Sequence, residues 1–96
     1  MKDEEILALV KEAHRYAEPD ERQVTDAIAF GASLADLGVA SISAMEMAGF
    51  IEDKLGINFS DDEMAVIGSI DDLAKLIRKY AAKDASRPPL KIRVGS

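Results

Sequence analysis

The 96-residue sequence contains no cysteine, a single histidine and no long apolar run. Without cysteine, the chain can form neither a disulfide framework nor a thiolate metal site. The one histidine, His14, excludes sites with several histidine ligands and makes most hydrolytic triads hard to assemble. A membrane-spanning helix needs roughly 18–20 apolar residues in succession, and no such run occurs. These absences predict a chain without a metal site, catalytic residues or a membrane span.

The length allows one small domain, with a thin core and little room for a buried catalytic cleft. The N-terminal segment Lys2-Asp3-Glu4-Glu5 is acidic, whereas a secretory signal peptide opens with basic residues and continues into an apolar stretch. We therefore expect a cytoplasmic protein.

Acidic residues outnumber basic ones by 18 to 12, and the formal net charge is −6. The acidic excess lies in the body of the chain: residues 36–72 hold nine acidic residues and one lysine, whereas residues 83–96 are basic. Such a body repels nucleic acid and steers basic protein surfaces toward itself. Two interpretations of the acidic face stay open, namely solubility and contact with a basic partner.

Apolar residues at helical spacing predict a first helix from about Asp3 to Tyr16. It should end before Pro19, because proline disfavours helical geometry in the residue ahead of it. Residues 18–40 form a long connection with weaker periodicity, and such a stretch should not be featureless in a compact domain. We expect its apolar residues to pack on the core, with a short helical turn near Asp26–Phe30.

A second helix is predicted from Ser41 or Ile42 to Leu55, with Gly56 as a left-handed residue after its end. Ser41 is a candidate N-cap, and Ser43 with Glu46 is an alternative capping box. The helix carries two apolar stripes, although a core needs only one. The second stripe is covered by the long connection or left for a partner; it consists of Ile42, Met45 and Gly49, beside Glu46 and Asp53.

Two further helices follow. Acidic residues at positions 61–63 favour a short third helix over about Asp62–Ile67, and Ser69 with Asp72 predicts the cap of a fourth. The fourth helix should end near Ala82, before a basic tail, residues 83–96, that we expect to be disordered. The predicted fold is all-α: a small antiparallel four-helix bundle, with three longer helices and one short helix, over residues 1–82.

Four side chains have expected environments that the fold can test. His14 is expected at the surface or boundary of the first helix, without a function. Met47 is expected in the core and Met45 outside it. Tyr80 is expected to pack in the core with its hydroxyl at the rim.

The most distinctive segment is Asp36-Leu37-Gly38-Val39-Ala40-Ser41-Ile42. A Leu-Gly turn ends one segment, and a serine then opens a helix. The serine offers a nucleophilic hydroxyl without an evident catalytic partner, since a pairing with His14 would require an unusual fold. Ser41 is therefore interpreted as an attachment point, against the simpler alternative of a helix cap that only accepts a backbone N–H.

This segment resembles the attachment motif of acyl carrier proteins, Asp-Leu-Gly-x-Asp-Ser-Leu, whose serine carries 4′-phosphopantetheine. Three later segments are similar to the family pattern, in the right order and at the right separations. The resemblance covers roughly residues 6–80 and implies the small antiparallel bundle of carrier proteins. The later segments are Glu46-Met47 with Phe50-Ile51-Glu52-Asp53-Lys54-Leu55-Gly56-Ile57, then Asn58-Phe59-Ser60-Asp61-Asp62-Glu63, and Ser69-Ile70-Asp71-Asp72-Leu73.

By this resemblance, Ser41 would receive 4′-phosphopantetheine from a phosphopantetheinyl transferase that uses coenzyme A and Mg²⁺. The terminal thiol would hold acyl groups as thioesters for fatty-acid, lipid or polyketide synthesis. The chain would be a monomer and not itself an enzyme, and both a freestanding carrier and a domain of a larger synthase fit the pattern. The transferase and the acyl-transferring or synthase enzymes would present basic docking surfaces to Ile42, Met45, Glu46, Glu52 and Asp53.

Two residues depart from the family pattern. Ala40 stands where the family most often has an aspartate, which can help to bind the transferase and its metal, and Ser43 stands where an acid is common. Three interpretations stay open: a specialised carrier with its own transferase, a carrier altered so that it remains unmodified, and an acidic adaptor that binds a basic partner without modification. Replacing Ser41 by alanine separates a carrier from an adaptor.

Overall fold

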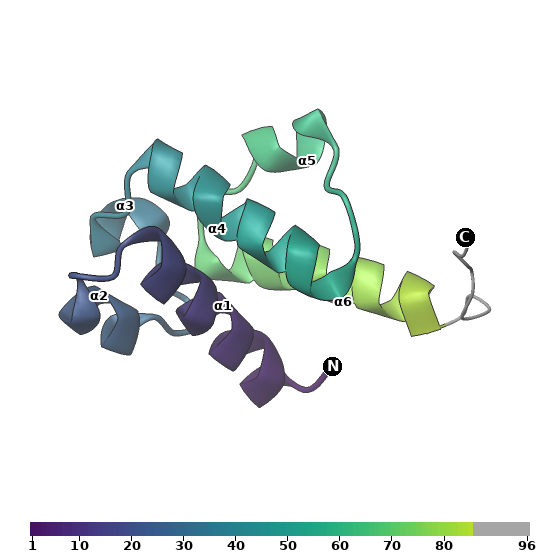
Figure 1. The fold of residues 1–96 in the computed structure, drawn as a ribbon, viewed down its shortest axis with the longest axis horizontal. Coiled ribbons are helices and arrows are strands. Elements are labelled where there is room, and N and C mark those ends of the chain that lie inside the picture. The colour runs from purple at the N-terminus through teal and green to yellow at the C-terminus, as the bar shows by residue number, and fades with distance from the viewer. Residues whose placement is uncertain (86–96) are drawn as a thin grey trace.

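The computed structural model describes residues 1–85, which form three long and three short helices (Figure 1). Their all-α arrangement confirms the predicted fold class, and the structure adds two short helices to the four expected. None of these helices combines the length and the apolar character that a bilayer crossing requires. The helices are Asp3–Ala17 (α1), Arg22–Ala27 (α2), Leu34–Leu37 (α3), Ser41–Leu55 (α4), Asp61–Ala65 (α5) and Ile70–Ala85 (α6).

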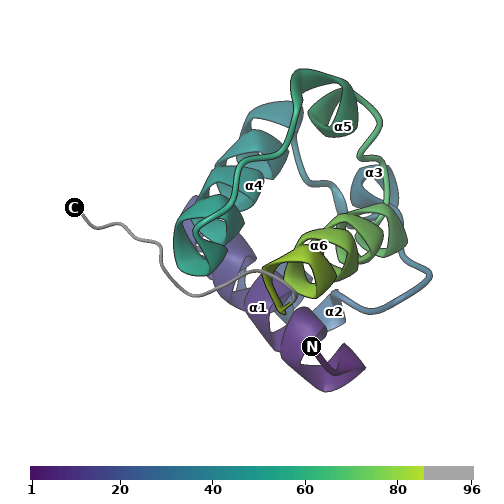
Figure 2. The ribbon, with the colours of Figure 1, turned by 90° about the vertical axis from the view of Figure 1, so that its right-hand side faces the viewer.

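The three long helices enclose the core. α1 runs in the opposite direction to α4 and α6 (Figure 1), and a view turned by 90° shows the three grouped around a common centre (Figure 2). Burying one large apolar side chain in this centre stabilises the fold by roughly 1.5–3 kcal/mol. The most buried apolar side chains are Ile6 and Val10 of α1, Met47 and Ile51 of α4, and Ile70, Leu73 and Ile77 of α6.

The long helices α1 and α4 end within one residue of their predicted ends. α1 stops at Ala17, and the Glu18 N–H donates to the His14 carbonyl at 2.7 Å as the chain turns toward Pro19. α4 stops at Leu55, and Gly56 adopts the left-handed conformation with a φ of 67°. Glycine takes that conformation readily because it has no Cβ, so its position sets where α4 ends.

The connection between α1 and α4 differs from the prediction. The helical turn expected near residues 26–30 lies earlier, in α2, and α3 was not predicted. Backbone hydrogen bonds to the start of α6 hold this region: the Leu34 N–H donates to the Gly68 carbonyl and the Ile70 N–H to the Ala32 carbonyl, each at 3.0 Å. Because these bonds join distant parts of the sequence, local periodicity gave no sign of them.

The last two helices lie close to their predicted positions. α5 occupies Asp61–Ala65 rather than residues 62–67, and Ser69 Oγ accepts the Asp72 N–H at 3.1 Å at the start of α6, as predicted. α6 continues to Ala85, three residues beyond its predicted end at Ala82. The first residues of the predicted tail are therefore helical, and the rest of that tail, residues 86–96, lies outside the described residues.

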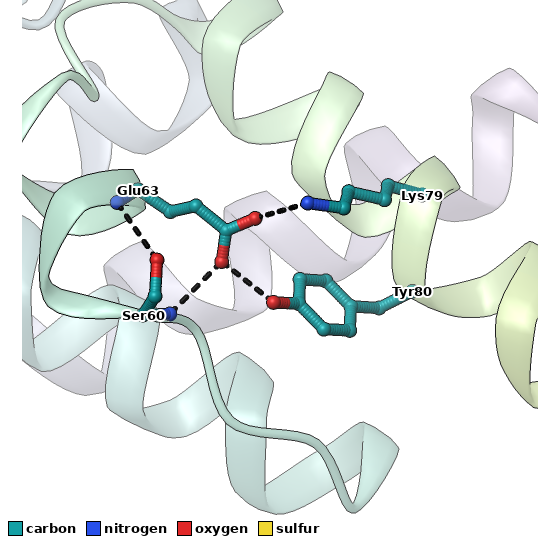
Figure 3. A network of polar contacts seen from close by, with 4 residues as sticks. All are labelled: Ser60, Glu63, Lys79 and Tyr80. Carbon is teal, nitrogen blue, oxygen red and sulfur yellow. Dashed lines mark hydrogen bonds and ion pairs between the residues drawn. The ribbon is translucent and has the colours of Figure 1, made fainter.

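A network of hydrogen bonds and one ion pair joins α5 to α6 (Figure 3). The Glu63 carboxylate accepts hydrogen bonds from Lys79 Nζ and the Tyr80 hydroxyl, each at 2.6 Å, and from the Ser60 N–H at 2.9 Å. Hydrogen bonding from Lys79, and next from Tyr80, lowers the pKa of Glu63 from 4.5 to about 2. Tyr80 also packs edge-on against Phe59 with 5.5 Å between ring centroids, so its ring is partly buried and its hydroxyl lies at the rim, as expected.

Candidate functional site

Ser41 is the first residue of α4 and is exposed. The prediction that Ser41 is the N-cap was wrong, because Ala40 occupies that position in extended conformation (φ −69°, ψ 155°) and offers no side-chain cap. The alternative box of Ser43 with Glu46 does not form either, since Ser43 lies inside the first turn. The Ser41 hydroxyl is thus not used to cap the helix that presents it.

The turn before Ser41 is built by α3 and Gly38. Ser33 Oγ caps α3 by accepting the Asp36 N–H at 2.9 Å, and Gly38 ends it in the left-handed conformation with a φ of 75°. The Val39 N–H then donates to the Leu34 carbonyl at 2.9 Å, and the Val39 side chain is buried. These contacts anchor the chain two residues before Ser41, so the serine enters α4 from a fixed position.

A hollow of about 410 Å³ lies beside Ser41, bounded by α3, the start of α4, and residues 64–68 at the end of α5 and just after it. Apolar side chains form most of its wall, and Ser41 lies on its edge. An apolar chain entering such a hollow would leave water, which is favourable. The lining residues are Leu34, Ala35, Val39, Ser41, Ala44, Met45, Met64, Ala65, Ile67 and Gly68.

Large apolar side chains are exposed around this hollow. Ile42 is 73 % exposed and Met45 is 62 % exposed, both within the first turns of α4. Val66, which follows α5, is 71 % exposed. Met45 lies outside the core and Met47 inside it, as predicted. The second apolar stripe of α4 is therefore left uncovered within the described part of the chain.

The predicted acidic partner positions lie farther along α4. Glu46 and Asp53 are exposed, and together with Gly49 they border a second hollow of about 320 Å³. The aromatic pair Tyr16 and Phe50 also lines this hollow, with 5.3 Å between ring centroids. Aromatic rings beside carboxylates form a surface that favours basic groups.

Glu52 differs from the other predicted partner positions. Its Oε2 accepts the Phe59 N–H at 2.7 Å, and the residue is half-buried. One of its carboxylate oxygens therefore holds the loop between α4 and α5, although the residue also borders the second hollow.

His14 is buried rather than at the surface, which corrects the expectation for this residue. Its ring is completely covered, with Nδ1 2.5 Å from Thr25 Oγ1 and Nε2 2.8 Å from Glu18 Oε1. Sequence periodicity places position 14 beside the buried Ala13 and Val10. It does not reveal that one hydrogen-bond partner of the ring, Thr25, comes from α2. Since both ring nitrogens are engaged, His14 does not serve Ser41 as a base.

Glu18 is the partner of His14 Nε2. Hydrogen bonding from the Ser43 hydroxyl lowers the pKa of the Glu18 carboxyl, opposed by desolvation and aided by His14 and the Ala40 N–H. Sequence reasoning did not single out Glu18. The spacing of His14 and Glu18, four residues apart at the end of a helix, was the only available signal.

The fold and the site define a carrier-type domain: a small helical bundle that presents one exposed serine beside an apolar hollow. Within the described residues, no group of histidine, aspartate and glutamate side chains is arranged to hold a metal ion. Residues 5–77 match the family model described as a phosphopantetheine attachment site. The match spans most of the chain, so the chain belongs to this family, whose domains carry 4′-phosphopantetheine covalently, and the resemblance to acyl carrier proteins is confirmed. Searches among curated proteins and solved structures found no match.

Proposed function

We propose that this chain is an acyl carrier protein with 4′-phosphopantetheine attached to Ser41. The observation that carries the proposal is the position of this serine: it is exposed at the first turn of a long helix, inside the matched family segment and on the edge of an apolar hollow. The domain would act as a monomeric, non-catalytic carrier in the cytoplasm.

Attachment would form one bond and break one. The Ser41 oxygen attacks the phosphorus next to the pantetheine arm of coenzyme A, an O–P bond forms and the diphosphate P–O bond breaks. Adenosine 3′,5′-bisphosphate leaves, and the hydroxyl proton passes to a base of the transferase. An exposed hydroxyl that caps no backbone N–H is free to make this attack.

The apolar hollow suits the other part of the proposed function, which is to hold an acyl chain. A thioester-linked acyl chain on the arm can withdraw from water between α4 and the end of α5, where Met64 of α5 and Ile67 after it line the wall. Fatty-acid, lipid and polyketide synthesis all use carriers of this kind, and we place the chain in that group of pathways.

Partner enzymes would dock on the exposed side of α4. Ile42 and Met45 offer apolar contact next to Ser41, while Glu46 and Asp53 offer charge farther along the same helix. Glu52 contributes less directly because one of its oxygens holds the Phe59 N–H. Exposed charges of this kind speed encounter with basic surfaces more than they strengthen the complex.

The test is the intact mass after incubation with coenzyme A, Mg²⁺ and a broad-specificity phosphopantetheinyl transferase. The wild type and a Ser43→Ala control should gain one phosphopantetheine, whereas Ser41→Ala should gain none. A Ser41→Ala variant that gains the same mass as the wild type would disprove the assignment.

A second candidate is favoured by one observation, the alanine at the cap position of α4 where the family pattern has an acid. In that case the chain would be an acidic adaptor that binds a basic partner without modification. If the chain is an adaptor, its Ala40→Asp variant also remains unmodified, and its Ser41→Ala variant binds the partner as well as the wild type does. Modification of the wild type excludes this candidate.

A further inference from the structure

α5 forms one wall of the apolar hollow beside Ser41. Met64 and Ala65 of α5 line the hollow, together with Ile67 just after the helix. α5 has five residues, Asp61–Ala65, and none of these five is buried. A helix this short does not persist in water by itself, because too few hydrogen bonds form to offset the cost of its first turn. The position of this wall therefore depends on contacts with the rest of the fold.

The chain is anchored on either side of α5. Before the helix, Phe59 is buried and its N–H donates to Glu52 Oε2 of α4 at 2.7 Å. After the helix, the Gly68 carbonyl accepts the Leu34 N–H at 3.0 Å. Residues 60–67 therefore span two fixed points, and the contacts made between those points decide where α5 lies.

Glu63 ties the middle of this span to α6 (Figure 3). Its carboxylate accepts hydrogen bonds from Lys79 Nζ and the Tyr80 hydroxyl, each at 2.6 Å. The Glu63 side chain is only 15 % exposed, and hydrogen bonds to a carboxylate that is largely shielded from water are stronger than those at an open surface. Glu63 directly precedes Met64, so the residue that ties α5 to α6 adjoins one that lines the hollow.

We propose that Glu63 is a positioning residue that limits the length of the acyl chain in the hollow, because its contacts with Lys79 and Tyr80 fix the wall formed by α5. This inference rests on the proposed function of Ser41 and deepens it. Without these contacts, residues 60–67 would be free to move outward and enlarge the hollow. With them, the carbons of an acyl chain that exceed the capacity of the hollow stay in water.

The experiment measures the melting temperature of the full chain carrying saturated acyl groups of increasing length on the Ser41 arm. The transferase loads each group from its acyl-coenzyme A, and intact mass confirms the loading. Each methylene that is buried in the folded protein raises the melting temperature relative to the unacylated carrier. Methylenes beyond the capacity of the hollow add nothing, so the melting temperature reaches a plateau at the chain length that fills it.

Two changes break the tie to α6 in different ways. Glu63→Gln removes the charge of the carboxylate. Lys79→Gln combined with Tyr80→Phe removes both donors on α6 and keeps the hydrogen bonds between Glu63 and Ser60. In both variants the plateau should move to acyl chains longer by about two methylene groups or more, because the released wall lets further methylenes leave water.

Arg78→Gln is the matched control. It removes the neighbouring ion pair of α6, whose partner is Asp3 of α1 at 2.7 Å, and leaves the contacts of α5 in place. Its plateau should stay at the wild-type chain length, even if its unacylated form melts as low as that of Glu63→Gln. Circular dichroism checks that each variant is folded before heating.

Each outcome has one meaning. A plateau at the wild-type length in Glu63→Gln or in the double variant overturns the role of Glu63 and leaves the proposed function intact. A plateau that also moves in Arg78→Gln assigns the effect to general loosening of the fold and overturns that role too. A wild type that is loaded but melts at one temperature with every chain length shows that the hollow takes no acyl chain, with the same consequence. A wild type that the transferase never loads overturns the proposed function of Ser41 first.

Discussion

Buried polar groups need hydrogen-bond partners, and the buried ring of His14 has one at each nitrogen. Replacing it removes a large buried side chain and leaves Glu18 and Thr25 without their shared partner. We predict that His14→Ala lowers the free energy of unfolding by about 2–4 kcal/mol, measured by urea denaturation. Arg15→Ala, on an exposed position of the same helix, should stay within about 0.5 kcal/mol of the wild type. A loss below about 1 kcal/mol for His14→Ala would contradict this account of the core.

Two glycines of the α4 region should respond to alanine with opposite signs. Gly49 lies inside the helix with nothing within 4 Å of where a Cβ would stand, whereas Gly56 has a φ of 67°. Gly49→Ala should therefore stabilise the protein by up to about 1 kcal/mol, and Gly56→Ala should destabilise it by about 1 kcal/mol. Thermal melting of the two variants side by side checks both signs. If both variants shift the melting temperature equally and in the same direction, backbone conformation does not determine how these glycines affect stability.

At the scale of elements, α5 depends on Glu63 for its attachment to α6. The pKa of Glu63 is lowered from 4.5 to about 2 in the folded protein. A group with a depressed folded pKa contributes stability that is present above its unfolded pKa and lost as the pH falls toward the folded value. The free energy of unfolding should therefore drop between about pH 4.5 and pH 2.

Glu63→Gln isolates this contribution. The variant should be less stable than the wild type at pH 7, and the difference should shrink as the pH falls from 4.5 to 2, because the protonated wild type has lost the same ion pair with Lys79. Urea unfolding at several pH values measures both curves, with Asp62→Asn as a control on the same helix. Parallel curves for the wild type and Glu63→Gln would rule out the Glu63 network as the source of the acid dependence.

The three long helices and the short α5 could be predicted from the sequence, whereas α2 and α3 could not. α1, α4 and α6 carry apolar residues at helical spacing, and two of them end at recognisable signals: α1 before Pro19 and α4 before Gly56. α2 and α3 are too short to establish a period, and bonds such as that from the Leu34 N–H to the Gly68 carbonyl hold their region in place. A contact between segments far apart in the sequence cannot be predicted from the local spacing of apolar residues.

In the candidate site, too, features with a local sequence pattern could be predicted and contacts between distant segments could not. The motif around Ser41 predicted its place at the start of a helix, and the contrast between Met45 and Met47 followed from helical spacing. The contact of His14 Nδ1 with Thr25 Oγ1 depends on how α2 packs against α1, so no local pattern contained it. The capping box of Ser60 and Glu63 did have a local signature, since a serine stands three residues before a glutamate.

At the scale of the whole molecule, the charge distribution predicts how the carrier meets its partners. Residues 36–72 hold nine acidic residues against one lysine. We predict that Glu46→Gln and Asp53→Asn each slow association with the transferase by up to about fivefold at low salt, as expected for exposed ion pairs of roughly 0.2–1 kcal/mol. The differences should fade as salt shortens the screening length to about 10 Å or less.

Stopped-flow association at two ionic strengths measures this effect, with Glu4→Gln on α1 as the control. Equal rates for Glu46→Gln, Asp53→Asn and the control at low salt would place the docking surface elsewhere on the molecule.

The central claim is that the chain carries phosphopantetheine on Ser41, and the most direct measurement localises the added group by fragmentation mass spectrometry of the modified protein. We predict that all of the added phosphopantetheine lies on Ser41 and none on Ser43. Modification at any other residue, or a wild-type chain that stays unmodified after incubation with transferase, coenzyme A and Mg²⁺, would contradict the claim.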